Sequence, residues 1–160
     1  MKVNWIHPVR GVQAGLSIAV LGLMGYVASW WTTHWRQMAP SEVHFLVFAP
    51  AWSLLALVPL ILVPLKFNHL LSTPAGRYGM VGLEGLTMLF WFSGFIALAV
   101  FLSDRICFGM VCDVARASAG LSALTWVAFT VTFVVGVIDL VKSLSKPAPL
   151  IKEVEMHQGV

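Results

Sequence analysis

Charged side chains are scarce in this chain of 160 residues. Asp, Glu, Lys and Arg make up only 11% of it, whereas about 25% is typical of a soluble domain. Hydrophobic residues make up 59%, and the mean hydropathy is +0.86. This deficit of charge indicates a chain whose main solvent is lipid. The basic residues behind the net charge of +3 do not cluster as in a nucleic-acid-binding patch, so we expect no nucleic-acid partner.

The sequence also lacks the motifs that carry chemistry. It has no pair of His residues at positions i and i+4, no Gly-rich phosphate loop, no H-E-x-x-H and no nucleophile motif. Its two cysteines have no further ligands at the spacing of a zinc site. We therefore expect neither an enzymatic activity nor a cofactor or metal.

Long hydrophobic runs fill most of the chain instead. They cover residues 12–31, 43–65, 81–102 and 119–141. A helix of about 20 residues crosses a hydrocarbon core of ~30 Å, and each run reaches that length. The runs predict an all-α polytopic membrane protein, a bundle of four transmembrane helices in a single domain over residues 1–160. Prolines interrupt the second run, so we expect a kinked second helix, with bends near Pro50 and Pro59.

The distribution of Lys and Arg predicts the orientation. One side of the membrane would hold Lys2, Arg10, Lys66, Arg77, Lys142, Lys146 and Lys152, and the other Arg36, Arg105 and Arg116. Because the richer side is normally cytoplasmic, we expect both termini in the cytosol and a flexible cytosolic tail over residues 143–160. We expect a plasma-membrane or secretory-pathway location. Lys66, Arg77, Lys142 and Lys146 are candidates for contact with lipid headgroups.

Both cysteines, Cys107 and Cys112, lie in the connection between the third and fourth runs. The predicted orientation puts this connection in an exterior or lumenal compartment, where oxidising conditions let thiols pair. A turn through residues 108–111 could bring the two Cα atoms within the ~7 Å that a disulfide requires. We therefore predict a disulfide, and two unpaired thiols at the membrane surface are the alternative.

Polar residues recur at seven-residue steps in the fourth run, at Ser118, Thr125, Thr132 and Asp139. This spacing places them on one seam of a helix pair. We interpret the seam as a packing surface with hydrogen bonds between helices. The alternative is a polar path for an ion or proton, which needs partners at matching depth on the facing helices. Candidate partners are few, namely Gln13, Ser17, Ser53, Thr87 and Ser93.

Glycines mark two further faces where helices could approach closely. Gly11, Gly15 and Gly22 lie on the first predicted helix, and Gly82 and Gly85 on the third. Small residues favour association where lipid gives no hydrophobic drive. The sequence leaves open whether these faces pack inside one chain or between copies, and a bundle within one chain is the more economical interpretation.

Glu84 and Asp139 are the two acids within or beside the predicted spans. An ionisable residue inside a membrane is a functional hypothesis by default. Each lies about one turn from the cytosolic end of its predicted span, within reach of Lys66, Arg77 or Lys142. An ion pair at the membrane interface, or a hydrogen bond to a nearby backbone donor, is therefore the simpler interpretation. Contact with a lipid headgroup or a partner helix is the alternative.

The pattern as a whole resembles MARVEL-domain proteins of fungi, the four-span membrane-associating domain. The segments that carry the resemblance are residues 10–15, 43–48 and 83–95, followed by the two-cysteine loop and residues 115–120. The resemblance implies an M-shaped protein of four membrane helices with cytosolic termini. It also implies roles in membrane apposition, lateral membrane organisation or trafficking, and no enzymatic activity. It carries over no functional residues.

We therefore expect a non-enzymatic integral membrane protein that organises membrane domains, membrane apposition or trafficking. Membrane lipids are the expected partners, and a homo-oligomer or a larger membrane protein remains open. The alternative function is a small accessory subunit of a larger transporter or membrane enzyme. A transporter or channel in its own right is the third hypothesis.

Overall fold

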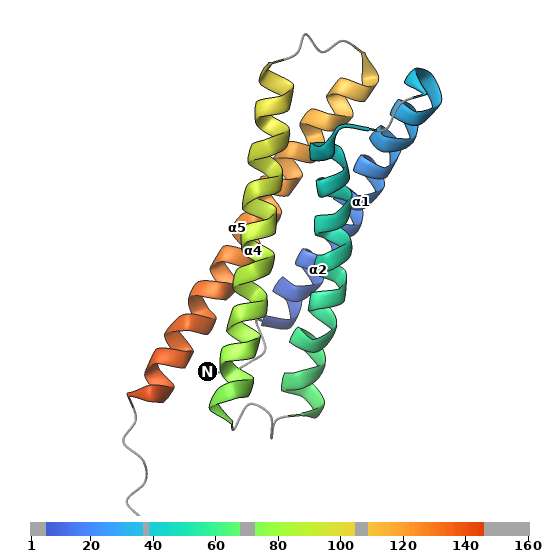
Figure 1. Cartoon of the computed structure of the whole chain (residues 1–160). Coiled ribbons are helices and arrows are strands. Elements are labelled where there is room, and N and C mark those ends of the chain that lie inside the picture. Colours follow the sequence, from blue (N-terminus) through green and yellow to red (C-terminus); the bar gives the residue numbers. More distant parts are fainter. Residues whose placement is uncertain (1–5, 37–38, 68–72, 105–108, 146–160) are drawn as a thin grey trace, which may run out of the picture.

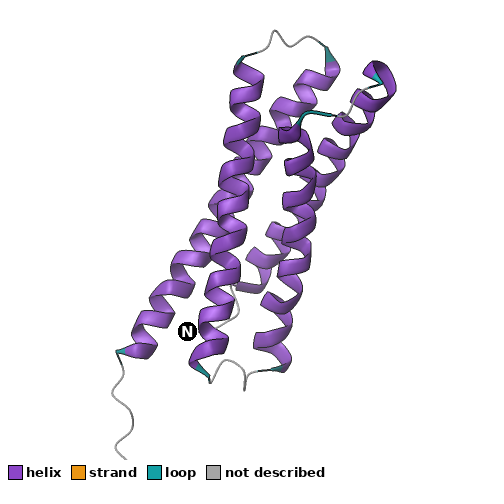
Figure 2. Cartoon of the chain, viewed as in Figure 1, coloured by secondary structure: helices purple, strands orange, loops and turns teal. Residues whose placement is uncertain are grey.

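The computed structural model describes residues 6–36, 39–67, 73–104 and 109–145. Within these ranges the chain forms helices and no strand (Figure 2). The helices are α1 (Ile6–Trp35), α2 (Ser41–Lys66), α4 (Pro74–Ser103) and α5 (Met110–Leu144). All four are long and apolar enough to cross a membrane. The prediction of an all-α, four-span membrane protein is confirmed.

The helices form a ring in which helices consecutive in the chain run antiparallel (Figure 1). α1 packs against α2 and α5, and α4 packs against the same two helices. The diagonal pairs, α1 with α4 and α2 with α5, have no close backbone contact in the described ranges. α1 begins and α5 ends at the same end of the bundle, which we call the terminal end (Figure 1). That this end faces the cytosol remains a prediction.

The buried positions of the helices recur at alternating steps of three and four residues. In α1 they are Arg10, Gln13, Ser17, Val20, Met24 and Val27, and in α4 they are Glu84, Thr87, Trp91, Gly94 and Leu98. A mean step of 3.5 residues keeps one face of each helix turned to its neighbours along the whole bundle. This period therefore decides which side chains enter the interior and which face the lipid.

α1 begins earlier than the hydropathy predicts, at Ile6 rather than at about residue 12. Pro8 lies in its first turn, where the missing N–H costs no intrahelical hydrogen bond. Arg10 is therefore a helical residue on the buried face of α1, and it is only 7% exposed.

α2 runs as one helix through Pro50, Pro59 and Pro64. Each proline removes one main-chain donor, a loss that membrane helices tolerate where neighbouring groups pack around the freed carbonyl. Pro50 is buried, and the other two are half-buried, so protein surrounds Pro50 and covers Pro59 and Pro64 in part. The predicted bends near Pro50 and Pro59 remain predictions.

Two glycines of α4 lie at close approaches to neighbouring helices. A Cβ on Gly94 would lie 2.9 Å from Cδ2 of Leu46 in α2, and a Cβ on Gly85 would lie 2.9 Å from Cε2 of Phe133 in α5. Both distances are overlaps, so a larger residue would displace its neighbour. Gly85 was among the residues predicted to allow close approach, and Gly94 was not.

The other predicted glycines do not pack within the bundle. A Cβ on Gly11, Gly15, Gly22 or Gly82 would meet nothing within 4 Å in the described part of the chain. The more economical interpretation, packing inside one chain, is therefore wrong at these positions. The reason is the burial period, which turns these positions away from the face that carries Arg10 and Gln13 in α1 and Glu84 in α4. Packing between copies of the chain remains a prediction.

Candidate functional site

A network of buried polar side chains joins three helices in the terminal half of the bundle. We call it the polar cluster, and it consists of Arg10 and Gln13 of α1, Glu84 of α4 and Thr132 of α5. Arg10 Nη1 donates to Glu84 Oε1 at 2.7 Å and to Gln13 Oε1 at 3.1 Å. Gln13 Nε2 donates to Thr132 Oγ1 at 3.0 Å and to the carbonyl oxygen of Ala128 at 3.1 Å. One chain of hydrogen bonds therefore runs from α4 through α1 to α5.

The Arg10–Glu84 ion pair crosses the bundle along its diagonal. α1 and α4 do not touch through their backbones, so the two long side chains bridge the interior between them. Removing two charges from water costs several kcal/mol per ion, which only a well-placed counter-charge and further hydrogen bonds offset. Arg10 and Glu84 meet that condition by neutralising each other. Arg10 Nε is buried and has no hydrogen-bond partner among the described residues.

Glu84 lies well inside α4 rather than near the beginning of the helix. α4 begins at Pro74, so Glu84 is ten residues into the helix, or about 15 Å along its axis at ~1.5 Å per residue. Lys66 is the last residue of α2, and Arg77 precedes Glu84 by about two turns. The expected ion pair of Glu84 with Lys66, Arg77 or Lys142 is therefore wrong, because the early start of α1 brings Arg10 to the depth of Glu84.

A second set of buried hydrogen bonds ties α2 to α4. Trp91 Nε1 donates to Ser53 Oγ at 2.8 Å, and both residues are fully buried. Trp52 Nε1 donates to Thr87 Oγ1 at 3.3 Å. An acceptor spares a buried indole N–H the free-energy cost of losing its hydrogen bond to water. These bonds fix how α2 and α4 face each other near the middle of the bundle.

The buried hydroxyls share one bonding arrangement. Each donates to a carbonyl of its own helix; they are Ser17, Ser53, Thr87, Ser118, Ser122, Thr125 and Thr132. A hydroxyl has a single proton but two acceptor positions. Ser53, Thr87 and Thr132 use an acceptor position for a donor from another helix. Because the protons are engaged within each helix, this arrangement favours a packing role over a path for protons.

The seam predicted on α5 is buried only in part. Ser118, Thr125 and Thr132 are buried, whereas Asp139 is exposed. Gln13 bonds to Thr132, so in this antiparallel pair the position facing Asp139 is seven residues before Gln13, at Ile6, where α1 begins. Asp139 therefore lies level with the first residue of α1, at the end of the α1–α5 contact. It also forms no ion pair with Lys142, which is exposed, within the described part of the chain.

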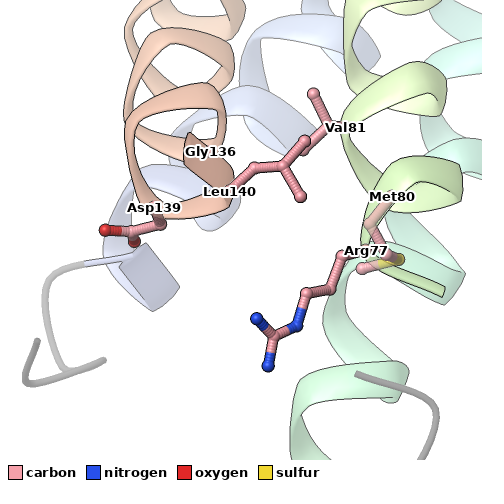
Figure 3. A pocket seen from close by; sticks show the side chains of 6 residues that line it. All are labelled: Arg77, Met80, Val81, Gly136, Asp139 and Leu140. Atoms are coloured by element: carbon pink, nitrogen blue, oxygen red, sulfur yellow. The ribbon is translucent and has the colours of Figure 1, made fainter. Parts of the chain in front are cut away.

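Two adjoining cavities, of about 290 and 240 Å³, open between α4 and α5 at the terminal end (Figure 3). We call them together the α4–α5 cleft. Its lining residues are Pro74, Arg77, Tyr78, Met80 and Val81 of α4, and Gly136, Asp139, Leu140, Ser143 and Leu144 of α5. Arg77 lines both cavities, and its Nη1 donates to the Ser143 hydroxyl. Figure 3 shows the carboxylate of Asp139 pointing away from Arg77.

The remaining predicted site residues are placed as follows. Lys66 and Lys142 are exposed, and Cys112 is buried near the start of α5. Cys107 and Lys146 lie outside the described residues, so the disulfide and the headgroup contact of Lys146 remain predictions. No group of three or more His, Cys, Asp or Glu side chains that could hold a metal ion occurs in the described ranges.

Sequence reasoning missed Arg10 as the partner of Glu84. It did name Gln13 among the few candidate partners of the α5 seam, and Gln13 bonds to Thr132 of that seam. One pattern in the sequence indicates that Arg10 is buried. Arg10, Gln13 and Ser17 follow the steps of three and four residues that mark the interior of a bundle.

A protein-family model described as a membrane-associating domain matches residues 6–135. The match includes α1, α2, α4 and most of α5, and with them every residue of the polar cluster. No curated protein and no solved structure matches the chain.

Proposed function

The chain belongs to the MARVEL family of membrane-associating domains, and from this premise we propose that it is a non-enzymatic organiser of membrane domains, membrane apposition or trafficking. The observation that carries the proposal is the internal pairing of Arg10 with Glu84. Ionisable groups that serve transport or catalysis in a membrane typically face a water-filled cavity or a pathway. These two groups neutralise each other and connect helices, which favours a structural role.

The outer surface of the bundle is then the part available for function. Large apolar side chains cover it, with Leu55 70% exposed, Leu124 59% and Ile18 58%. Such a surface suits lipid and the apolar faces of other membrane helices. The outward glycines Gly11 and Gly15 add a place where a second helix could approach closely. Copies of this chain and larger membrane proteins are therefore the partners that we propose besides lipid.

The proposal includes a location and an orientation. We place the protein in the plasma membrane or the secretory pathway, with both termini in the cytosol, on the basis of its excess of Lys and Arg on that side. The same orientation supports a disulfide between Cys107 and Cys112 on the opposite side.

Imaging and purification together test the organising role. The full chain carrying a fluorescent tag is reconstituted in giant vesicles of two lipid compositions and imaged for lateral distribution. An organiser is expected to concentrate in patches whose extent changes with composition. A uniform distribution in both compositions contradicts the proposal.

The same tag separates the organiser from an accessory subunit. Affinity purification from native membranes in mild detergent, followed by mass spectrometry, measures what stays bound. An accessory subunit retains one large protein in a fixed ratio. An organiser retains lipid and variable amounts of several proteins.

A further inference from the structure

We propose that a groove between α2 and α4 binds Arg116 of a second copy of this chain, so that copies join head to tail in the plane of the membrane. The groove is a cavity of about 560 Å³ at the end of the bundle opposite the terminal end, and we call it the α2–α4 groove (Figure 1). Its lining residues are Glu42, Ala97, Val100, Phe101 and Asp104. The inference rests on the proposed function, because it gives the association of copies a defined surface and a defined partner residue.

The groove carries two carboxylates, and neither has a cationic partner among the described residues. Glu42 is half-buried in the first turn of α2, where it accepts a hydrogen bond from the Ser41 hydroxyl at 3.2 Å. Asp104 is exposed and caps the carboxyl end of α4. The groove is therefore negatively charged on both of its sides.

The position of Asp104 is unfavourable for the helix that carries it. The carboxyl end of a helix bears a partial negative charge, which favours Lys, Arg or His there and disfavours Asp. The last turn of α4 contains no basic residue that would offset this charge. The helix dipole therefore adds to the charge of the carboxylate, and both attract a cation from outside the chain.

Arg116 of another copy lies at the depth that the groove requires. It is an exposed residue of α5. Trp126 of α5 packs against Phe95 of α4, with 5.7 Å between the ring centroids. Because α4 and α5 run antiparallel, about three turns from Trp126 toward the start of α5 reach Arg116, and about the same distance from Phe95 toward the end of α4 reaches Asp104. Copies that share one orientation in the membrane therefore hold the two charges at similar depths.

Within one chain, Arg116 does not occupy the groove. It forms no ion pair with Glu42 or Asp104 in the described part of the chain. The groove lies between α2 and α4, and α5, which carries Arg116, has no close backbone contact with α2 in the described ranges. The contact between copies would therefore join two different surfaces. Such a contact repeats from copy to copy until a ring closes or a filament extends, which gathers many copies in one patch.

The chemistry of the groove favours an arginine side chain over a lipid headgroup. A guanidinium binds carboxylates through parallel N–H groups, and its apolar stem packs on apolar walls such as Val100, which is 54% exposed. The two carboxylates would repel the phosphate of an anionic lipid. A zwitterionic headgroup carries its phosphate beside its cation, so it meets the same repulsion.

Energy transfer between donor-labelled and acceptor-labelled copies of the full chain in lipid vesicles measures the association. The ratio of lipid to protein is varied to obtain an apparent dissociation constant. Arg116→Gln should weaken association about tenfold, the effect of losing one charge-assisted bond. Arg36→Gln is the matched control, because Arg36 is also exposed at this end of the bundle, and it should change the constant less than twofold.

A mixture of two variants tests whether the contact is head to tail. Asp104→Arg damages the groove and Arg116→Glu damages its partner, so each variant alone should show no specific transfer. Donor-labelled Asp104→Arg mixed with acceptor-labelled Arg116→Glu should regain transfer, because Arg116 of the first variant still meets the intact groove of the second. Both residues are exposed, so circular dichroism should show unchanged helix content.

Four results would overturn the contact. They are wild-type protein without specific transfer, wild-type affinity in Arg116→Gln, an equal loss in Arg36→Gln, and a mixture of Asp104→Arg with Arg116→Glu that regains no transfer. An equal loss in Arg36→Gln would show that only general surface charge brings the copies together.

The outcome for the groove can be told apart from the outcome for the proposed function. Composition-dependent patches that form in giant vesicles, while Arg116→Gln keeps wild-type energy transfer, overturn the contact alone. Energy transfer that depends on Arg116, in a protein that stays uniformly distributed in both lipid compositions, overturns the organising role alone.

Discussion

Ser53 and Ser17 are both serines in the interior of the bundle, but they differ in the hydrogen bonds that they form to other helices. Both are fully buried, and both donate to a carbonyl four residues earlier in their own helix. Only Ser53 also accepts a hydrogen bond from another helix, from the indole N–H of Trp91. A buried donor that loses its acceptor bears its full desolvation penalty, whereas a hydroxyl bonded to its own helix contributes little to holding helices together.

The substitution Ser53→Ala tests this difference. It should lower the free energy of unfolding by about 1–3 kcal/mol, because the indole of Trp91 is left buried without an acceptor. Ser17→Ala is the matched control and should lower it by less than about 0.5 kcal/mol, since no donor of another helix is left unpaired. Both values are measured by titrating purified protein in mixed micelles with a denaturing detergent. Equal losses for the two variants would contradict the role given to Ser53.

At the scale of the helix, glycine matters where a neighbouring backbone or side chain comes close. Gly94→Ala should destabilise the bundle by about 1–3 kcal/mol, because the added methyl overlaps Leu46 in a fully packed interior. Gly15→Leu adds a larger side chain to the outer face of α1 and should leave the stability of the monomer nearly unchanged. Detergent unfolding measures both. A loss at Gly15→Leu as large as that at Gly94→Ala would show that the outer face of α1 is packed.

The oligomeric state gives the control for that experiment. If copies of the chain associate through the glycine face of α1, Gly15→Leu should reduce the size of the particle measured by light scattering while the stability of each chain is kept. An unchanged particle size would remove this face as a contact between copies.

The existence and order of the helices could be predicted from the sequence, because in lipid the length of an apolar run translates directly into a membrane span. The residues at which the helices begin and end could not be predicted in this way. Hydropathy detects the part of each helix that lies in hydrocarbon. α1 and α4 begin before that part, at Ile6 and Pro74, and their first turns include polar residues. The early start of α1 was therefore not predicted, and neither was the pairing of Arg10 with Glu84 that it allows.

The partners inside the bundle were harder to predict than its helices. Arg10 and Glu84 are 74 positions apart and lie on helices that do not touch through their backbones, so neither spacing nor neighbouring charge reveals the pair. The seven-residue repeat on α5 does include the buried Thr132. The repeat cannot reveal that α1 begins opposite Asp139, because that depends on how α1 and α5 are aligned with each other.

At the scale of the whole molecule, the buried polar groups lie within an otherwise apolar core, and apolar side chains also cover the outer surface. Lipid gives helices no hydrophobic reason to associate, so hydrogen bonds and close packing hold the bundle together. The polar cluster connects α1 with α4 and with α5. The hydrogen bonds of Trp91 and Trp52 connect α2 with α4. The lipid-facing surface is left free for contacts with the membrane.

The two cysteines, Cys107 and Cys112, test the predicted orientation of the whole molecule. We expect that alkylation of intact cells leaves Cys107 and Cys112 unmodified unless a reductant is added, because a disulfide forms in an oxidising compartment. Mass spectrometry of the alkylated peptide measures this. Free labelling of both thiols without reductant would contradict the pairing. Protease accessibility of tags at Met1 and Val160 from opposite faces of sealed vesicles would contradict the topology.

Arg10 and Glu84 act as one unit that joins α1 to α4, and a double-mutant cycle measures the coupling between them. The free energy of unfolding is compared for wild type, Arg10→Met, Glu84→Gln and the double variant. We predict that each single change costs about 3–5 kcal/mol, because it leaves one buried charge without its partner, and that the double variant costs less than the sum of the two. Single losses that simply add in the double variant would contradict the claim.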